Sequence, residues 1–162
     1  MSFPEPYFLG IDPGTSGGIA LLDTDGRVVY VSAMPDEDRA IFCLLAPLGR
    51  VVYAALERVW SSPGWGHVGA FTFGTNYGAI RMALVAHGVP VEDVLPRRWQ
   101  KVMGVSYPKA AKRVKGAPPS PPVRRDKNIT KTLAQNLFPG TRVTHAIADC
   151  LLIAEYKRRT TL

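Results

Sequence analysis

The sequence predicts an α/β fold in which one five-stranded mixed sheet is flanked by helices. Three short apolar runs, separated by turn residues, open the chain and predict an antiparallel meander. Helical and strand-like patterns then alternate, which is typical of parallel strands joined by helical crossovers. With 162 residues, 46% of them hydrophobic and 20% charged, we expect a single globular domain over residues 1–162.

Three strands are expected in the first part of the chain. Residues 7–12 form an apolar run, and the turn Gly14–Gly18 leads to a second strand at 19–22. The hairpin signal Asp25-Gly26 leads to a third strand at 28–31. Because short turns join these strands, we expect them to pair antiparallel, with the first three strands side by side.

A helix and a central strand follow. The acidic stretch Pro35–Asp38 is typical of a helix start. The expected apolar face of this helix comprises Ile41, Phe42, Leu44, Leu45 and Leu48. Residues 51–59 are too apolar for an edge strand, which predicts a central position parallel to the first strand. Cys43 and Cys150 have apolar neighbours, so we expect both to be reduced core residues.

A loop, a helix and the fifth strand come next. Residues 60–69 are rich in glycine and tryptophan, which predicts a loop before a helix at 70–87. Residues 89–95 form the fifth expected strand. Pro96 then begins a short basic helix that extends through Met103.

The last third of the chain predicts a basic loop and two helices. Residues 105–123 carry several lysines and a run of prolines, so we expect an extended, basic, Pro-rich loop there. Helices are predicted at 124–137 and 144–158, separated by a break at Pro139-Gly140.

Positive charge is concentrated in the second half of the chain. Residues 82–162 hold 15 Lys and Arg against five Asp and Glu, whereas residues 1–81 hold five against eight. Eleven of the basic residues lie between Arg97 and Lys131, where the single acid is Asp126. A solvated basic face is the plainer interpretation. Clustered Lys and Arg also bind polyanions by releasing phosphate counterions, which favours a nucleic-acid surface.

Three acidic residues stand in apolar surroundings. Asp12 ends the first strand, Glu57 lies near the end of the central strand, and Asp149 lies within the last helix. A buried carboxylate is costly unless it is paired or bound to a metal, so we expect the three to meet at one end of the sheet. His145 precedes Asp149 by one helical turn and would project from the same face.

This set of side chains suits a hard divalent cation. Carboxylate oxygens with one imidazole favour Mg²⁺ or Mn²⁺ over zinc, and two such ions could clamp a phosphodiester. Taken singly, the residues have plainer explanations. Asp12 could be a turn residue, Glu57 a partner in an ion pair, and His145 a surface residue at a helix start. Their combination favours a metal site.

Five motifs, in order along the chain, resemble those of the RuvC-type crossover junction endodeoxyribonucleases, especially the phage-encoded branch, within the RNase H-like superfamily. The motifs are Gly10-Ile11-Asp12-Pro13-Gly14, Leu56-Glu57, Thr72–Gly78, Val94–Lys101 and Thr144–Asp149. The resemblance spans nearly the whole chain and implies an RNase H-like fold.

The resemblance also implies a catalytic site. Asp12, Glu57 and Asp149 would be the catalytic metal-binding carboxylates, with two Mg²⁺ or Mn²⁺ ions per site. His145 falls where relatives carry a fourth acidic residue or a histidine. It could bind metal, orient water or donate a proton. Protonation of its imidazole would weaken metal binding, so activity is expected to fall in mild acid.

The substrate implied by the resemblance is a four-way (Holliday) DNA junction. A homodimer would nick two symmetric strands and leave 5′-phosphate and 3′-hydroxyl ends. The helix at 70–87 would form the dimer surface through Ile80, Met82, Leu84 and Val85, although these side chains could instead pack on the sheet.

Expected DNA contacts combine the basic residues with one loop tryptophan. Trp65 could stack on unpaired bases at the branch point, whereas Phe73 is expected in the core or at the dimer interface. By the same resemblance, Lys127 and Lys101 align with basic residues that relatives place near the scissile phosphate. The candidate DNA-binding residues are Trp65, Lys101, Lys109, Lys112, Arg113, Lys115, Arg124, Arg125, Lys127 and Lys131.

Other functions would fit parts of the same sequence pattern. An RNase H-like nuclease that acts on structured RNA would have the same catalytic site. In a non-catalytic junction-binding protein, the three acids would have no catalytic role. The first motif also resembles the phosphate loop of actin-like ATPases, but their further nucleotide loops are missing, so no nucleotide cofactor is expected. No apolar run approaches the ~18 residues of a membrane span, and no signal-peptide pattern is present, which predicts a cytoplasmic protein, in the host if phage-encoded.

Overall fold

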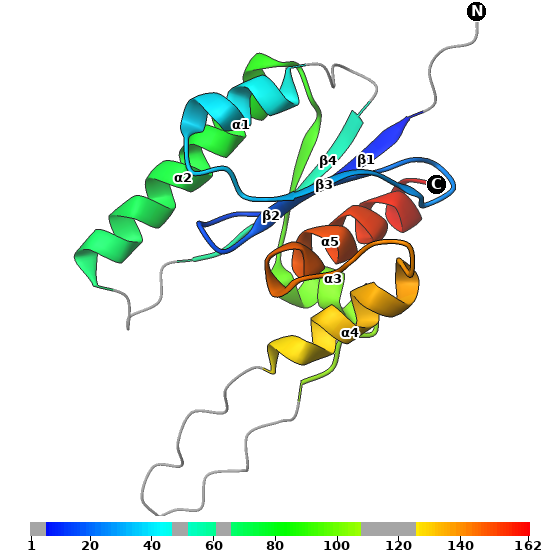
Figure 1. The fold of residues 1–162 in the computed structure, drawn as a ribbon. Helices are drawn as coiled ribbons and strands as arrows, with labels where there is room; N and C mark the ends of the chain where they lie inside the picture. The colour runs from blue at the N-terminus through cyan, green and yellow to red at the C-terminus, as the bar shows by residue number, and fades with distance from the viewer. Residues whose placement is uncertain (1–5, 47–51, 61–65, 108–125) are drawn as a thin grey trace, which may run out of the picture.

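The computed structural model describes residues 6–46, 52–60, 66–107 and 126–162 (Figure 1). These residues form strands and helices in the predicted order. The elements are β1 (Tyr7–Asp12), β2 (Gly18–Leu22), β3 (Val28–Ala33), α1 (Asp38–Leu45), β4 (Val52–Glu57), α2 (His67–Ala86), β5 (Val91–Val94), α3 (Pro96–Val102), α4 (Lys127–Leu137) and α5 (His145–Thr161).

The five strands form one mixed sheet in the order β3-β2-β1-β4-β5. β1, β2 and β3 pair antiparallel, which confirms the predicted meander. β4 pairs parallel with both β1 and β5, so β4 is a central strand as predicted. The two parallel pairs place the carboxyl ends of β1, β4 and β5 at the same edge of the sheet.

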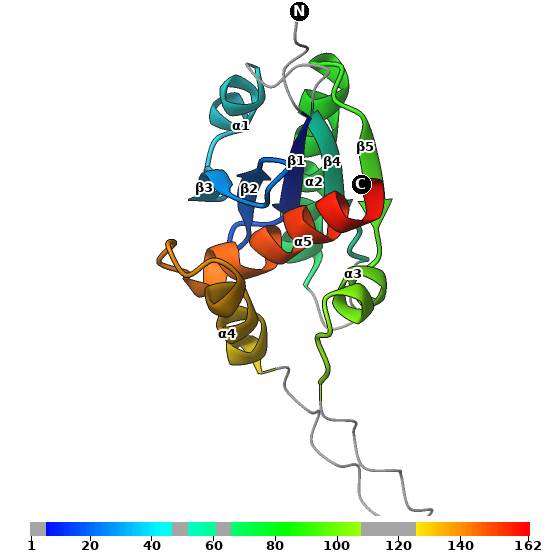
Figure 2. The same cartoon turned by 90° about the vertical axis from the view of Figure 1, so that its right-hand side faces the viewer.

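Helices cover both faces of the sheet. Alternation along β2 assigns the faces: Ala20 and Leu22 pack in a cluster with α5, whereas Ile19 and Leu21 pack in a second cluster with α1 and α2. Figure 2 shows α5 crossing one face of the sheet, with α3 and α4 on its side. We refer to this side as the α5 face and to the opposite side as the α2 face.

Two glycines allow α5 to lie unusually close to the sheet. A Cβ atom added at Gly10 would lie 2.2 Å from the backbone nitrogen of Ala154 and 2.2 Å from the carbonyl oxygen of Cys150. A Cβ atom at Gly18 would lie 2.7 Å from the carbonyl oxygen of Ala146. Contacts under 3.0 Å leave no room for any side chain, so α5 rests directly on the backbone of β1 and β2.

Several boundaries differ from the predictions. The helix α2 begins at His67, so residues 67–69 are helical rather than part of the predicted loop. The fifth strand is shorter than predicted and covers only Val91–Val94. Within the described residues α4 begins at Lys127, where the side chain of Asp126 accepts a hydrogen bond from the amide of Asn128 at 2.9 Å and caps the helix.

Two predictions about the α2 face are wrong in part. Cys43 is exposed rather than in the core, whereas Cys150 is buried as predicted. Phe42 is 45% exposed, and its ring lies against that of His87 with centroids 4.3 Å apart. Ile41 and Leu45, one helical turn apart, are buried in the core, and the partly buried Leu44 packs against the same cluster, as predicted. Leu48 lies outside the described residues.

The predicted dimer surface on α2 also needs correction. Ile80 and Leu84 are fully buried in the cluster on the α2 face, so they pack on the sheet. Met82 and Val85 are 61% and 55% exposed. Only the latter pair remains available for a contact with another molecule.

Within the described residues, no helix is both long and apolar enough to cross a membrane.

The close contact between α5 and β1 predicts a large penalty for a side chain at Gly10. Gly10→Ala is expected to destabilise the protein by about 3 kcal/mol or more, because the backbone of α5 must move away. Gly78→Ala is the matched control: this glycine is in α2, and an added Cβ meets nothing within 4 Å. It should stabilise the protein by about 0.5–1 kcal/mol through helix propensity. Urea denaturation measures both, and equal effects would contradict the packing argument.

Candidate functional site

Asp12 and Glu57 lie side by side at one edge of the sheet. Ile11 of β1 pairs with Leu56 of β4 in a parallel register, so the next residue of each strand lies at the same level. Ile11 and Leu56 belong to the cluster on the α2 face. Since side chains alternate along a strand, Asp12 and Glu57 project toward the α5 face.

Asp149 joins this pair from α5. The helix passes over the sheet at Gly18, where an added Cβ would lie 3.1 Å from Sγ of Cys150, the neighbour of Asp149. The charge of Asp149 acts on both Asp12 and Cys150. The structure therefore brings together three carboxylates from β1, β4 and α5 that are distant in the sequence.

The gathered negative charge changes the acidity of the site. Burial raises the pKa of Asp12 well above its usual value, and the charges of Glu57 and Asp149 raise it further. A side-chain hydrogen bond with Glu57 acts in the same direction, and the positive charge of Lys127 opposes these effects. Burial and the charges of Asp12 and Asp149 likewise raise the pKa of the Cys150 thiol. The site thus favours an added positive charge, either a proton or a cation.

Glu57 is held by a residue of α3. The indole Nε1–H of Trp99 donates a hydrogen bond of 2.7 Å to Oε1 of Glu57. Glu57 is 8% exposed and Trp99 is fully buried, so this is an interior contact. A charge-assisted hydrogen bond of this kind stabilises a carboxylate that has lost much of its water.

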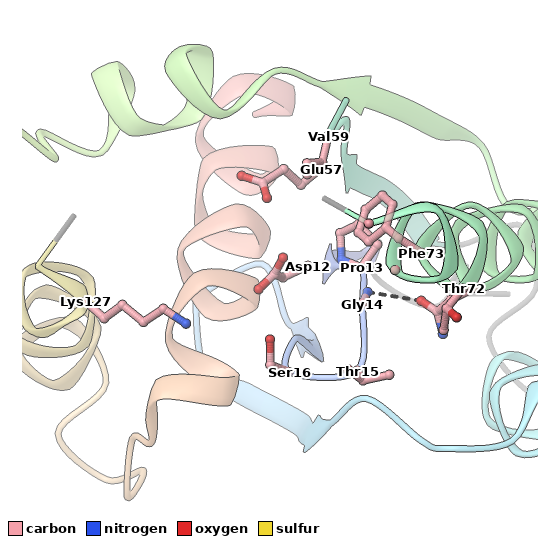
Figure 3. A pocket seen from close by; sticks show the side chains of 13 residues that line it. Asp12, Pro13, Gly14, Thr15, Ser16, Glu57, Val59, Thr72, Phe73 and Lys127 are labelled. Atoms are coloured by element: carbon pink, nitrogen blue, oxygen red, sulfur yellow. Dashed lines mark hydrogen bonds between the residues drawn. The ribbon is translucent and has the colours of Figure 1, made fainter. Parts of the chain in front are cut away.

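The turn after β1 is anchored to α2. Gly14 has a φ of 105°, a conformation that side-chain-bearing residues rarely adopt. Its amide donates a hydrogen bond of 3.0 Å to Oδ1 of Asn76 (Figure 3). The ring of Phe73 lies 3.4 Å from the position of an added Cβ at Gly14. These contacts fix the backbone that leaves Asp12.

A cavity of about 670 Å³ opens in front of Asp12 and Glu57. The turn after β1 and one face of α2 line it, including Phe73, which therefore borders the site. In Figure 3 the side chain of Lys127 reaches from α4 toward Asp12 and Ser16. Among the described residues, the lining of this cavity thus contains the carboxylates of Asp12 and Glu57 and the ammonium group of Lys127. Carboxylates can bind a cation, and an ammonium group can bind an anionic substrate.

The remaining candidates are not among the residues that line this cavity, or they lie outside the described residues. His145 is exposed in the first turn of α5, and Lys101 is exposed on α3. Lys131 is partly buried on α4, one turn after Lys127. The candidates outside the described residues are Trp65, Lys109, Lys112, Arg113, Lys115, Arg124 and Arg125. Trp60 is 64% exposed, and the guanidinium of Arg58 lies 4.4 Å from its ring centroid.

The donor set fits a hard cation. Three carboxylates supply the oxygen ligands that Mg²⁺ and Mn²⁺ prefer. Burial first, and then the charges of the other two acids, raise the pKa of Asp12. Among the residues that the structure describes, no three His, Cys, Asp or Glu side chains are already arranged as a metal-binding group.

Trp99 and Asn76 are site residues that the sequence did not single out. Both lie within motifs that carried the family resemblance, Val94–Lys101 and Thr72–Gly78. Membership of these motifs was the available signal. Their partners, Glu57 and Gly14, are 42 and 62 residues away in sequence, which local patterns do not reveal.

Comparison with solved structures identifies the fold. RuvC of Thermus thermophilus in complex with a Holliday junction substrate matches with a TM-score of 0.63 and 17% sequence identity. A second Thermus thermophilus RuvC structure matches with a TM-score of 0.63 and 18% identity. In both cases 96% of this chain and 96% of the other chain are covered. No family model and no curated protein matches the sequence. The fold is therefore RNase H-like, as predicted.

The raised pKa of Asp12 predicts that its charge destabilises the metal-free protein. Between its usual pKa and the raised one, the unfolded chain loses this proton while the folded chain keeps it, so stability falls as the pH rises. Above the raised pKa the penalty is complete. Asp12→Asn should therefore stabilise the protein in EDTA at neutral pH, by about 1 kcal/mol or more, and have little effect near pH 3.

Thermal unfolding across pH measures this difference, at roughly 2–4 °C per kcal/mol for a chain of this size. Asp36→Asn, at an exposed position before α1, is the control and should change little at either pH. A destabilised Asp12→Asn protein at neutral pH would contradict the proposed repulsion.

Proposed function

We propose that this protein is a metal-dependent, structure-specific endodeoxyribonuclease that resolves four-way DNA junctions. The observation that carries the proposal is the convergence of Asp12, Glu57 and Asp149 beside a cavity. This convergence occurs on a fold shared with RuvC, which in one matched structure is in complex with a Holliday junction substrate. Because fold alone does not define activity, the proposal rests on these acids.

In this proposal Asp12, Glu57, Asp149 and His145 hold the catalytic cations. Bound there, one or two Mg²⁺ or Mn²⁺ ions would supply a water of lowered pKa and neutralise charge on the phosphate. The three carboxylates provide the negative charge that such ions need. Burial and the neighbouring acids raise the pKa of Asp12, and a bound cation would lower it again.

Lys127 would act on the phosphate that is cut. Its side chain extends from α4 to the cavity beside Asp12 and Ser16 (Figure 3). A fixed ammonium at this place would attract the phosphodiester and stabilise negative charge that develops during hydrolysis. The other basic candidates between Lys101 and Lys131 would hold the arms of the junction through their phosphates.

The wider proposal follows the family that the sequence resembles. A homodimer would make paired symmetric nicks and leave 5′-phosphate and 3′-hydroxyl ends, acting in DNA recombination, repair or debranching. A phage origin and a place in the host cytoplasm belong to the same proposal. The exposed Met82 and Val85 of α2 would contribute to the contact between the two copies.

Replacing a carboxylate tests the catalytic role. Asp12→Asn and Glu57→Gln should each lower nicking of a synthetic four-way junction by at least about 10³-fold with Mg²⁺ or Mn²⁺, because a cation loses a charged ligand. Junction binding, measured by gel shift in Ca²⁺, should remain within about threefold of wild type, since the basic residues are unchanged.

Asp36→Asn and Glu37→Gln are matched controls, because both acids are exposed. Neither should change nicking. Linear duplex and RNA hairpins are included as substrates, since preferential cutting of RNA would favour an RNA-processing nuclease. Undiminished nicking by Asp12→Asn would refute the catalytic site, and junction binding without any nicking by the wild type would favour a non-catalytic binding protein.

His145 has a test of its own. His145→Ala should weaken Mn²⁺ binding, measured by the loss of the free-ion signal in electron paramagnetic resonance, by about tenfold if the imidazole is a ligand. It should lower the nicking rate at saturating Mn²⁺ with unchanged binding if the imidazole transfers a proton. His67→Ala, at the start of α2, is the matched control. A variant that is normal in both measurements would remove His145 from the site.

A further inference from the structure

Glu57 is the most deeply buried of the three site carboxylates. It is 8% exposed, whereas Asp12 and Asp149 are partly buried. Its neighbours include the carboxyl of Asp12, with which it shares a hydrogen bond, so its position is set partly by an acid that repels it when both are ionised. A carboxylate in such surroundings needs a fixed donor to hold its orientation.

That donor belongs to α3, which follows β5 directly in the sequence. Val94, the last residue of β5, pairs with Glu57, and the carbonyl oxygen of Val94 accepts a hydrogen bond of 2.8 Å from the amide of Arg58. Pro96 then begins α3 directly after the strand. This short connection keeps α3 near the end of β4, where the buried side chain of Trp99 reaches Glu57.

Trp99 of α3 is the residue that donates a hydrogen bond to Glu57. It is fully buried in the apolar cluster on the α5 face, with Met103 and Phe138 among its members. Its only polar atom, Nε1, donates to Oε1 of Glu57 at 2.7 Å. Indole nitrogen is a donor and never an acceptor, so the bond favours the ionised form of the carboxylate and fixes one of its two oxygens.

We propose that Trp99 is a positioning residue that orients Glu57 for cation binding. With Oε1 held by the indole, rotation of the carboxyl group is restricted, so the carboxylate presents one orientation to a cation. Packing of the ring fixes the donor itself, because a fully buried indole has little freedom to turn. The role as a cation ligand rests on the proposed function, whereas the hydrogen bond does not.

The hydrogen bond can be tested in the metal-free protein. The chain has three tryptophans, so ¹⁵N-labelled tryptophan gives three indole N–H signals. Trp99→Phe assigns one of them. Glu57→Gln should shift that signal upfield, because a neutral amide accepts a weaker hydrogen bond than a carboxylate. The exposed Glu37→Gln should leave it in place. An unchanged Trp99 signal in Glu57→Gln would overturn the proposed contact.

Cation affinity tests the positioning role. Trp99→Phe should raise the Mn²⁺ concentration for half-saturation by about 10–100-fold, the usual effect of losing a partner that orients a ligand. Electron paramagnetic resonance of free Mn²⁺ measures this without any nicking assay. Phe138→Leu is the matched control, since it shortens an apolar side chain of the same cluster and removes no hydrogen-bond donor. It should leave Mn²⁺ affinity within about twofold.

If Trp99→Phe does not fold, 3-benzothienylalanine at position 99 keeps the ring shape and replaces only the N–H. The same loss of Mn²⁺ affinity is expected from it. Wild-type affinity in either folded variant would overturn the inference, even where Asp12→Asn abolishes nicking and so supports the nuclease. Normal nicking by Asp12→Asn would instead refute the proposed function, while the indole signal would still report on the hydrogen bond.

Discussion

The direct contact of α5 with the backbone of β1 determines where the site can form. Gly10 and Gly18 provide the room, since an added Cβ at either would come under 3.0 Å from the backbone of α5. A helix packed on ordinary strand side chains would stand further from the sheet. Asp149 would then lie further from Asp12, whose side chain projects from β1 toward the same face. Two residues without side chains thus make a three-carboxylate site possible.

This arrangement has an energetic cost that the surrounding residues reduce. Burial and repulsion raise the pKa of Asp12, so the metal-free site opposes folding at neutral pH. Lys127 lowers the repulsion from one side, and Trp99 stabilises the carboxylate of Glu57 from another. Functional sites commonly carry such a cost, because the geometry needed for chemistry differs from the geometry of greatest stability.

Much of this fold could be predicted because its strands are marked by apolar runs and turn residues. The same signals located Asp12 and Glu57 at strand ends, and parallel pairing made them neighbours. Helix orientation was harder to predict. Phe42 and Cys43 lie in an apolar stretch yet are exposed, because the side of α1 that packs in the core is formed by Ile41, Leu44 and Leu45. Where a whole segment is apolar, composition does not reveal which side of a helix is buried.

The sequence did not predict the contacts that connect the site carboxylates to the surrounding helices. Trp99 on α3 and Lys127 on α4 both reach the site carboxylates, and the predicted basic loop lies between these two helices in the sequence. A phosphate backbone bound by that loop would be linked through α3 to Glu57 and through α4 to Lys127. In the proposed function, substrate binding and the orientation of the carboxylates would therefore involve the same two helices. The site is not an isolated group of acids at a sheet edge, since α3 and α4 each supply a side chain that acts on its carboxylates.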